Sequence, residues 1–235
     1  MAATKEGEHL ALVQQVDELN LEHKYQEVYD LLAAAPQHLK DHPEILWRQA
    51  RASYDIADTK PDDKKWKEKY YREAFSFSQT ALEKDSTSFG PHKWFAVTLS
   101  ALGDFVSTKE KIQNSFLIKE HSLKALEYKP KDPTTLHMLG RWCYAVANVG
   151  WIERKLAATL FASPPESSFA EAIGYFQKAH ELHVWTGNIF WLGMAYESEG
   201  KHDSSKEIWQ TALSIQPLSR REEEELKLIK KKLRL

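Results

Sequence analysis

Few residues in this sequence have the type and spacing that catalysis needs. His38 and His42 are four residues apart, a spacing that lets two imidazoles share a metal ion, but Pro43 follows and no third ligand is evident. The single cysteine, Cys143, falls at a packing position inside a helical pattern, which is typical of a small apolar residue rather than a nucleophile. The sequence has no glycine-rich phosphate loop and no HExxH motif. We therefore expect a protein that is not an enzyme and that has no catalytic residue, metal or cofactor.

Cationic side chains offer a different chemistry, the binding of polyanions. Three groups of lysines stand out: Lys64, Lys65, Lys67 and Lys69 (with Lys60 before them); Lys109 and Lys111; and Lys230, Lys231 and Lys232 (with Arg234 after them). The first two groups fall in expected connections between helices. Connections of one type emerge at one edge of a stack of helix pairs, so these lysines could form one basic rim. The alternative is an ordinary solvated surface, because acidic residues are interspersed among them.

The composition sets the class of protein. The chain has 235 residues, of which 42% are hydrophobic and 28% charged, and its net charge is −2. This balance predicts a globular chain that does not bind nucleic acid through its overall charge. No apolar run of about 18 residues is present, so we expect no transmembrane segment. The first residues lack the apolar core of a signal peptide, and a single cysteine fits a reducing compartment, so we expect a cytoplasmic protein.

The elements that must position these side chains are paired helices. Between Thr186 and Pro217 a short motif is most complete: it comprises Leu192-Gly193, Tyr196, Trp209, Ala212 and Pro217. These are the offsets of a tetratricopeptide (TPR) repeat, a helix-turn-helix unit of 34 residues. Gly193 removes a side chain where the first helix must approach the second closely, and Gly200 suits the turn between them. One such pair cannot bury its apolar face alone, so we expect neighbours of the same kind.

Small residues mark the second helix of each expected pair: Ala35, Ala81, Ala125, Ala179 and Ala212. Their unequal spacing indicates longer helices or inserted turns within pairs. We therefore predict an all-α, TPR-like right-handed superhelix of about five antiparallel helix pairs. The predicted order is a disordered start at residues 1–7, a repeat domain at 8–217 and a capping helix at 218–235, with pairs at about 8–36, 43–85, 91–129, 133–183 and 186–216. A partner-binding basic helix is the alternative for residues 218–235.

The first helices of such pairs line a concave groove. The side chains that we place in it are Arg48, Phe95, Leu99, His137, Arg141, Tyr144, Phe190 and Met194. Arginine beside aromatic rings suits an extended peptide that carries carboxylates, because guanidinium binds carboxylate bidentately. A peptide-binding adaptor and a lipid-binding or lipid-transfer module are therefore both open, and so is the simpler interpretation that these residues belong to the core.

Four stretches go beyond a generic repeat: HKWFAVTLSALGDF (92–105), IKEHSLKALEYKPKDPTT (118–135), GRWCY (140–144) and LFASPPESS (160–168). In these stretches the sequence resembles the regulator of microtubule dynamics family, strongly over about residues 45–185 and more loosely at the flanks. The resemblance implies a TPR-like protein linked to microtubules, spindle poles and chromosome segregation. Some members of that family carry an N-terminal membrane anchor, and we expect none in this chain because it begins directly with helical repeat.

The resemblance and the residues lead to the same expectation. The outer surface of a microtubule is acidic, so a basic rim or an arginine-lined groove could bind tubulin, with an affinity that falls as salt rises. We expect the concave groove to accept other spindle or scaffold proteins, and the protein to be found on the cytoskeleton, the spindle and the spindle poles. The segment with Trp151, Arg154, Lys155, Phe161 and Pro164-Pro165 is predicted to form a short helix and an extended turn over the groove or its edge.

Overall fold

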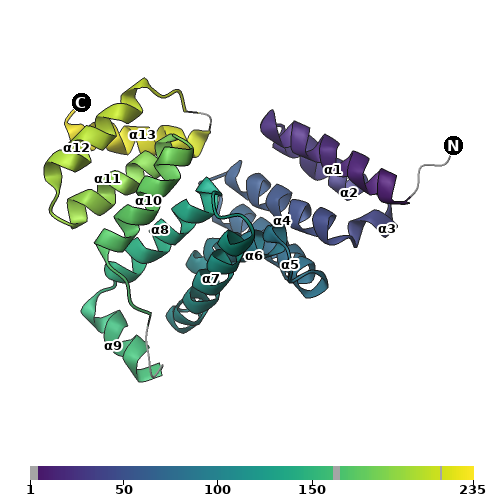
Figure 1. The fold of residues 1–235 in the computed structure, drawn as a ribbon, viewed down its shortest axis with the longest axis horizontal. Helices are drawn as coiled ribbons and strands as arrows, with labels where there is room; N and C mark the ends of the chain where they lie inside the picture. Colours follow the sequence, from purple (N-terminus) through teal and green to yellow (C-terminus); the bar gives the residue numbers. More distant parts are fainter. Residues whose placement is uncertain (1–4, 161–164, 218) are drawn as a thin grey trace. The chain divides into compact units, whose positions relative to one another are not determined.

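The computed structural model describes residues 5–160, 165–217 and 219–235 (Figure 1). Every regular element in these ranges is a helix, so the prediction of an all-α chain is confirmed. The chain divides into two compact units, at residues 1–106 and 107–235. Within the described residues, no helix is both long enough and apolar enough to cross a membrane.

Unit 1 contains the helices α1 to α6 and a short 3-10 turn, η1. Their bounds are α1 Lys5–Leu21, α2 Tyr25–Ala34, α3 Gln37–Lys40, α4 Pro43–Asp58, α5 Lys64–Lys84, α6 Phe89–Ala101 and η1 Leu102–Asp104. α4 begins where the sequence predicts, with Pro43 in its first turn and the His42 ring accepting a hydrogen bond from the Glu44 backbone N–H. α4 packs against α5, and α6 covers both.

The core of unit 1 has two parts. Val16, Val28 and Ile45 are fully buried and join α1, α2 and α4. Further along the unit, Ile56 and Tyr71 join α4 to α5 in a second cluster that is rich in aromatic rings. Aromatic side chains bury a large area each, so this second cluster holds the beginning of α5 against α4 and η1.

Unit 2 contains α7 to α13 and a second 3-10 turn, η2. Their bounds are α7 Thr108–Tyr128, α8 Pro133–Ala147, α9 Trp151–Leu160, α10 Phe169–Leu182, α11 Thr186–Ser198, α12 His202–Thr211, η2 Ala212–Ser214 and α13 Arg220–Leu233. α8 packs against α10, α10 against α11, and α11 against α12, so consecutive helices stack as in a repeat. α13 lies against α11, α12 and η2, and its role as a capping helix stays a prediction.

Glycine positions in unit 2 follow the predicted motif closely. A Cβ atom on Gly193 would lie only 2.0 Å from Trp209 Nε1, so only glycine allows α11 and α12 to approach this closely. A Cβ atom on Gly140 would lie 2.7 Å from the ring of Phe176, so only glycine allows α8 and α10 to approach this closely. Gly200 adopts φ +79°, the left-handed backbone that the turn before α12 requires.

The structure changes three of the predicted boundaries. α1 begins at Lys5, so residues 5–7 are helical instead of disordered, and residues 1–4 lie outside the described residues. The predicted pair at 91–129 is divided, because α6 belongs to unit 1 and α7 to unit 2. The irregular spacing arises from long helices, since α5 and α7 have 21 residues each, and from the extra helix α9, which packs against α7.

Candidate functional site

The first turns of α5 carry the densest group of lysines in unit 1. We use the name lysine surface for Lys60, Lys64, Lys65, Lys67 and Lys69. The Asp63 side chain caps this helix by accepting a hydrogen bond from the Trp66 backbone N–H at 2.9 Å. Pro61 and the two aspartates after it separate Lys60 from the helix. Lys64 and Lys65 follow directly in the first turn of α5, where both are exposed.

Aromatic rings lie directly beneath this lysine surface. The Lys60 ammonium is 3.6 Å from the centre of the Trp66 ring. Three further ammonium groups lie over rings in the same way: Lys69 over Tyr70 at 4.7 Å, Lys67 over Tyr71 at 5.6 Å and Lys64 over Phe105 at 5.9 Å. A cation over the face of an aromatic ring is stabilised by about 0.5–1 kcal/mol at an exposed site. The rings therefore hold the ammonium groups near the surface of the helix without neutralising their charge.

The rings themselves are fixed from below. Trp66 Nε1 donates a hydrogen bond to the Ile56 carbonyl at 2.9 Å, and the Tyr71 hydroxyl donates to Asp58 at 2.5 Å. Three acidic residues lie within the run: Asp62, Asp63, which caps the helix, and Glu68, which is paired with Arg72 at 2.8 Å. In the described part of the chain, none of the five lysines forms an ion pair with a carboxylate. Their charge is thus directed to solvent.

The other two lysine groups lie in unit 2. Lys109 and Lys111 are exposed in the first turn of α7, where Ser107 and Glu110 form a capping box. Because these lysines and the lysine surface belong to different units, the single basic rim stays a prediction. Lys230 and Lys231 are exposed in the last turn of α13, while Lys232 pairs with Glu197 and lies 5.6 Å from the Trp209 ring.

Arg48 is internal, and its assignment to a partner-binding groove is wrong. Its side chain is 6% exposed, its guanidinium Nη2 lies 2.5 Å from Asp17 Oδ2, and Nη1 donates to Glu44 at 2.7 Å. It also stacks on Trp47 at 3.9 Å. Arg51 pairs with the same Asp17 at 2.7 Å. These contacts tie α1 to α4, so the charge of Arg48 is used within the protein.

Phe95 is buried and His137 is partly buried, and both are engaged in contacts within the chain. Phe95 is 8% exposed and packs against Phe75 with ring centres 5.5 Å apart; the neighbouring groove candidate, Leu99, is buried too. His137 Nδ1 is 2.9 Å from Asn188 Oδ1, and its ring lies between Phe176 and Trp185. Burial lowers the pKa of His137 to about 3, so this imidazole is neutral at physiological pH.

Phe190 and Met194 form part of the contact with α13. Both pack against a cluster that includes Ile189, Trp209 and Ile229, the last of which is a fully buried residue of α13. Side chains that the sequence places in an open groove are therefore partly buried against a cluster to which the C-terminal helix contributes.

Arg141 and Tyr144 are the two groove candidates that reach a cavity. The cavity has a volume of about 320 Å³, and its lining residues are Arg141, Tyr144, Ala145, Asn148, Val149 and Trp191. Arg141 stacks on the Trp191 ring at 4.3 Å, and the Tyr144 hydroxyl is 3.2 Å from Ser198 Oγ. α8 and α11 thus present one cation and two aromatic rings at this cavity.

Comparisons with known proteins identify the family. Residues 12–235 match the family described as "Regulator of microtubule dynamics protein 1-3". The chain belongs to this family. The bovine regulator of microtubule dynamics protein 1 is 38% identical over 197 residues, which cover 83% of this chain and 62% of the relative. The bovine regulator of microtubule dynamics protein 2 is 30% identical over 224 residues, which cover 94% and 54%. The chain thus spans a little over half of the length of these relatives.

The solved structures confirm the fold of this family member. A thermophilic TPR protein from Thermus thermophilus superimposes with a TM-score of 0.64 at 14% identity, covering 97% of this chain and all of that one. At this level of identity the likeness concerns the fold alone. The predicted TPR-like arrangement of helix pairs is therefore confirmed.

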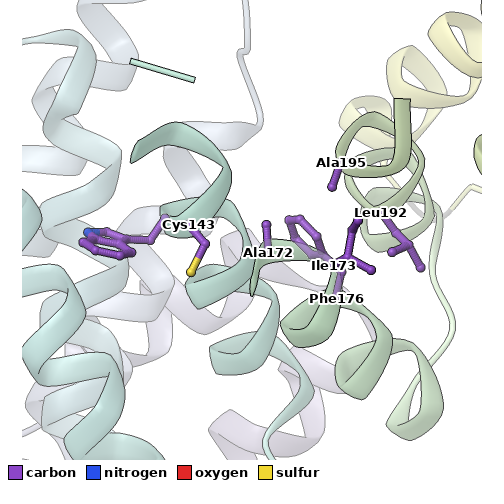
Figure 2. Close-up of a cluster of buried hydrophobic side chains, with 7 residues drawn as sticks. Cys143, Ala172, Ile173, Phe176, Leu192 and Ala195 are labelled. Carbon is purple, nitrogen blue, oxygen red and sulfur yellow. The ribbon is translucent and has the colours of Figure 1, made fainter. Parts of the chain in front are cut away.

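Cys143, the residue with the greatest potential as a nucleophile, is part of the packed core. Cys143 is 1% exposed and packs with Ala172, Phe176 and Leu192 where α8, α10 and α11 meet (Figure 2). Burial raises the pKa of its thiol to about 11, so a thiolate nucleophile is disfavoured.

The two histidines of the possible chelate face different partners. His38 is 3.1 Å from Glu8, whereas His42 stacks on His9 with ring centres 3.9 Å apart. Among the described residues, no group of three or more His, Cys, Asp or Glu side chains is placed to hold a metal ion. His38 therefore links α3 to α1, and His42 packs against α1 at the beginning of α4.

Two features of the site were missed from the sequence. The lysines of α5 alternate with Trp66, Tyr70 and Tyr71 in the run KKWKEKYYR, and this interleaving of basic and aromatic residues was a readable signal. Trp191, which stacks on Arg141, had no such signal, because its position beside α8 depends on how two pairs stack. On the extra helix, Arg154 and Lys155 are exposed, whereas Phe161 and Pro164 lie outside the described residues.

Proposed function

We propose that this chain is a non-enzymatic binding protein that contacts the acidic surface of microtubules through the lysine surface of α5. The observation that carries the proposal is that four lysines in the first turns of α5, and Lys60 just before it, form no ion pair with a carboxylate in the described residues, and that four of the five lie over aromatic rings. Such a surface attracts a polyanion at long range, and the glutamate-rich tails of tubulin are one.

The relatives support this choice of partner by name, since they are regulators of microtubule dynamics. By binding tubulin the protein would act in microtubule dynamics, spindle organisation and chromosome segregation, and would reside on the cytoskeleton, at the spindle and its poles. The lipid-binding alternative has less support, because Phe95 and Leu99 are buried in unit 1 while Phe190 and Met194 pack under α13.

Co-sedimentation with microtubules over a salt series tests the proposal. The variant is Lys64→Glu/Lys65→Glu, which reverses two exposed charges and adds acidic residues at a helix N-terminus, where they are tolerated. The matched control is Lys201→Glu/Lys206→Glu, which makes the same charge change at exposed positions beside and on α12. The α5 variant should bind at least about 10-fold more weakly than the control, because several screened charge contacts are lost together.

Two outcomes would contradict the proposal. In the first, both double variants weaken binding equally, which would mean that net charge rather than the lysine surface matters. In the second, microtubules stripped of their acidic tails pellet the protein as well as intact ones do.

A further inference from the structure

The contact between α13 and the rest of unit 2 has the form of a peptide bound in a groove. Leu226, Ile229 and Leu233 are spaced i, i+3 and i+7 along α13, and they pack against the apolar cluster around Trp209. Helix-in-groove recognition between separate proteins uses this same spacing of apolar anchors. Here the groove and the helix belong to one chain.

The acidic end of α13 is recognised specifically. Glu225 is 8% exposed, and its carboxylate faces the first turn of α11: a Cβ atom on Gly187 would lie 3.0 Å from Glu225 Oε2. No side chain caps α11, and a carboxylate at a helix N-terminus is stabilised by the helix dipole.

Cations from two helices act on this carboxylate. Nε of Arg221, on α13 itself, lies 3.4 Å from Glu225 Oε1. Arg141, on α8, also interacts electrostatically with the Glu225 carboxylate. Burial nevertheless leaves the pKa of Glu225 raised, because desolvation outweighs the two arginines. The basic end of α13 has its own partner, since Lys232 pairs with Glu197 near the end of α11.

The arrangement thus specifies a ligand by three features: a carboxylate at the α11 N-terminus, an apolar stripe over Phe190 and Met194, and a cation at Glu197. The cavity beside Arg141 and Trp191 is lined by α8, α11 and the two residues after α8, and no α13 residue lines it. A helix longer than α13, or one with a side chain that enters this cavity, could therefore make contacts that α13 does not make.

We propose that this face of α11 is a docking site for an amphipathic helix of a partner protein that carries a carboxylate near its beginning and a cation near its end, and that α13 occupies it in cis and is displaced when the partner binds. Residues 215–219 join η2 to α13, and so short a tether gives α13 an effective concentration in the millimolar range. A partner helix at lower concentration competes poorly until α13 is released. This inference does not depend on microtubule binding, which is assigned to unit 1.

A labelled peptide with the sequence of residues 219–235 serves as the probe, and its binding to the full chain is measured by fluorescence anisotropy. Glu225→Arg in the chain places a cation beside Arg221 and Arg141 and should release α13. The peptide should then bind at least about 10-fold more tightly to this variant than to the unmodified chain, because the tethered competitor has left. A peptide that itself carries Glu225→Arg should not bind either chain.

The matched control is Glu223→Arg, the same charge reversal on the exposed face of α13, which should leave peptide binding as in the unmodified chain. Ile229→Ala is a second release variant that changes no charge, and it should also raise peptide affinity. Hydrogen exchange should show that α13 alone loses amide protection in both release variants while α11 and α12 keep theirs.

Two results would overturn the inference. Equal peptide affinity for the unmodified chain and both release variants would mean that α13 does not compete for the site. Loss of amide protection in α11 and α12 together with α13 would mean that α13 is an inseparable part of the fold.

Discussion

Replacing Gly193 by alanine tests the close approach of α11 and α12. The added Cβ atom would lie 2.0 Å from Nε1 and 2.4 Å from Cε2 of Trp209, whereas non-bonded carbon atoms prefer about 3.5–4.0 Å. The indole has no room to withdraw, because Trp209 is 2% exposed and its Nε1 donates a hydrogen bond to the Phe190 carbonyl at 3.3 Å. Either the ring or the helix must therefore move by more than about 1 Å.

The size of the effect follows from two opposing contributions. Overpacking a core costs about 1–3 kcal/mol, and the severity of this clash places Gly193→Ala at the upper end. Alanine favours a helix interior by about 1 kcal/mol over glycine, which offsets part of that loss. We expect Gly193→Ala to lower the free energy of unfolding by about 2 kcal/mol.

Gly174→Ala provides the matched control. Gly174 lies within α10 of the same unit, and a Cβ atom there would meet nothing within 4 Å. This variant should be more stable than the unmodified chain by up to about 1 kcal/mol. Urea unfolding followed by far-UV circular dichroism measures both variants. A Gly193→Ala protein at least as stable as the Gly174→Ala protein would refute the packing argument.

Three further predictions concern titratable groups whose pKa is shifted by burial. Asp55 accepts a hydrogen bond from Asn20 at 3.2 Å, yet burial raises its pKa to about 7 from 3.8, so its contribution to stability is complete below about pH 4 and is lost as pH rises toward 7. Asp55→Asn should therefore flatten the dependence of the urea midpoint on pH over that range, and an unchanged slope would contradict the assignment. His137 has a pKa lowered to about 3 by burial, so its ring proton signals in NMR should not shift between about pH 5 and 8, whereas a midpoint near 6.5 would show an accessible ring. Cys143, with its pKa raised to about 11 by burial, should react with a thiol reagent only when the protein is unfolded in urea; rapid labelling of the folded chain would place the thiol at the surface.

Local signals in the sequence were enough to predict the helices and several of their ends. Pro43 and Asp132-Pro133 start α4 and α8, Gly200 permits the turn before α12, and the Ser219 hydroxyl caps α13 by accepting a hydrogen bond from the Glu222 backbone N–H. Each of these effects acts within a few residues of chain, so the residue type is sufficient evidence.

The candidate site was only partly predictable. The lysines of α5 were named from their clustering, because a run of charge near an expected helix start is visible in one dimension. Arg48 was assigned to the groove from its repeat position, but its partner, Asp17, is 31 residues away on another helix. An ion pair of that kind is decided by which helices pack together, and repeat spacing contains no information about it.

By itself the sequence determined an all-helical chain of stacked pairs, since helix periodicity, caps and the Gly193–Trp209 spacing depend on short-range geometry. Only the tertiary structure decided which cations face solvent and which are paired, that Phe190 and Met194 pack against the same cluster as Ile229 of α13, and that the chain divides after Val106. The physical reason is that burial and charge pairing depend on contacts between residues far apart in the chain, which form once the helices have chosen their neighbours.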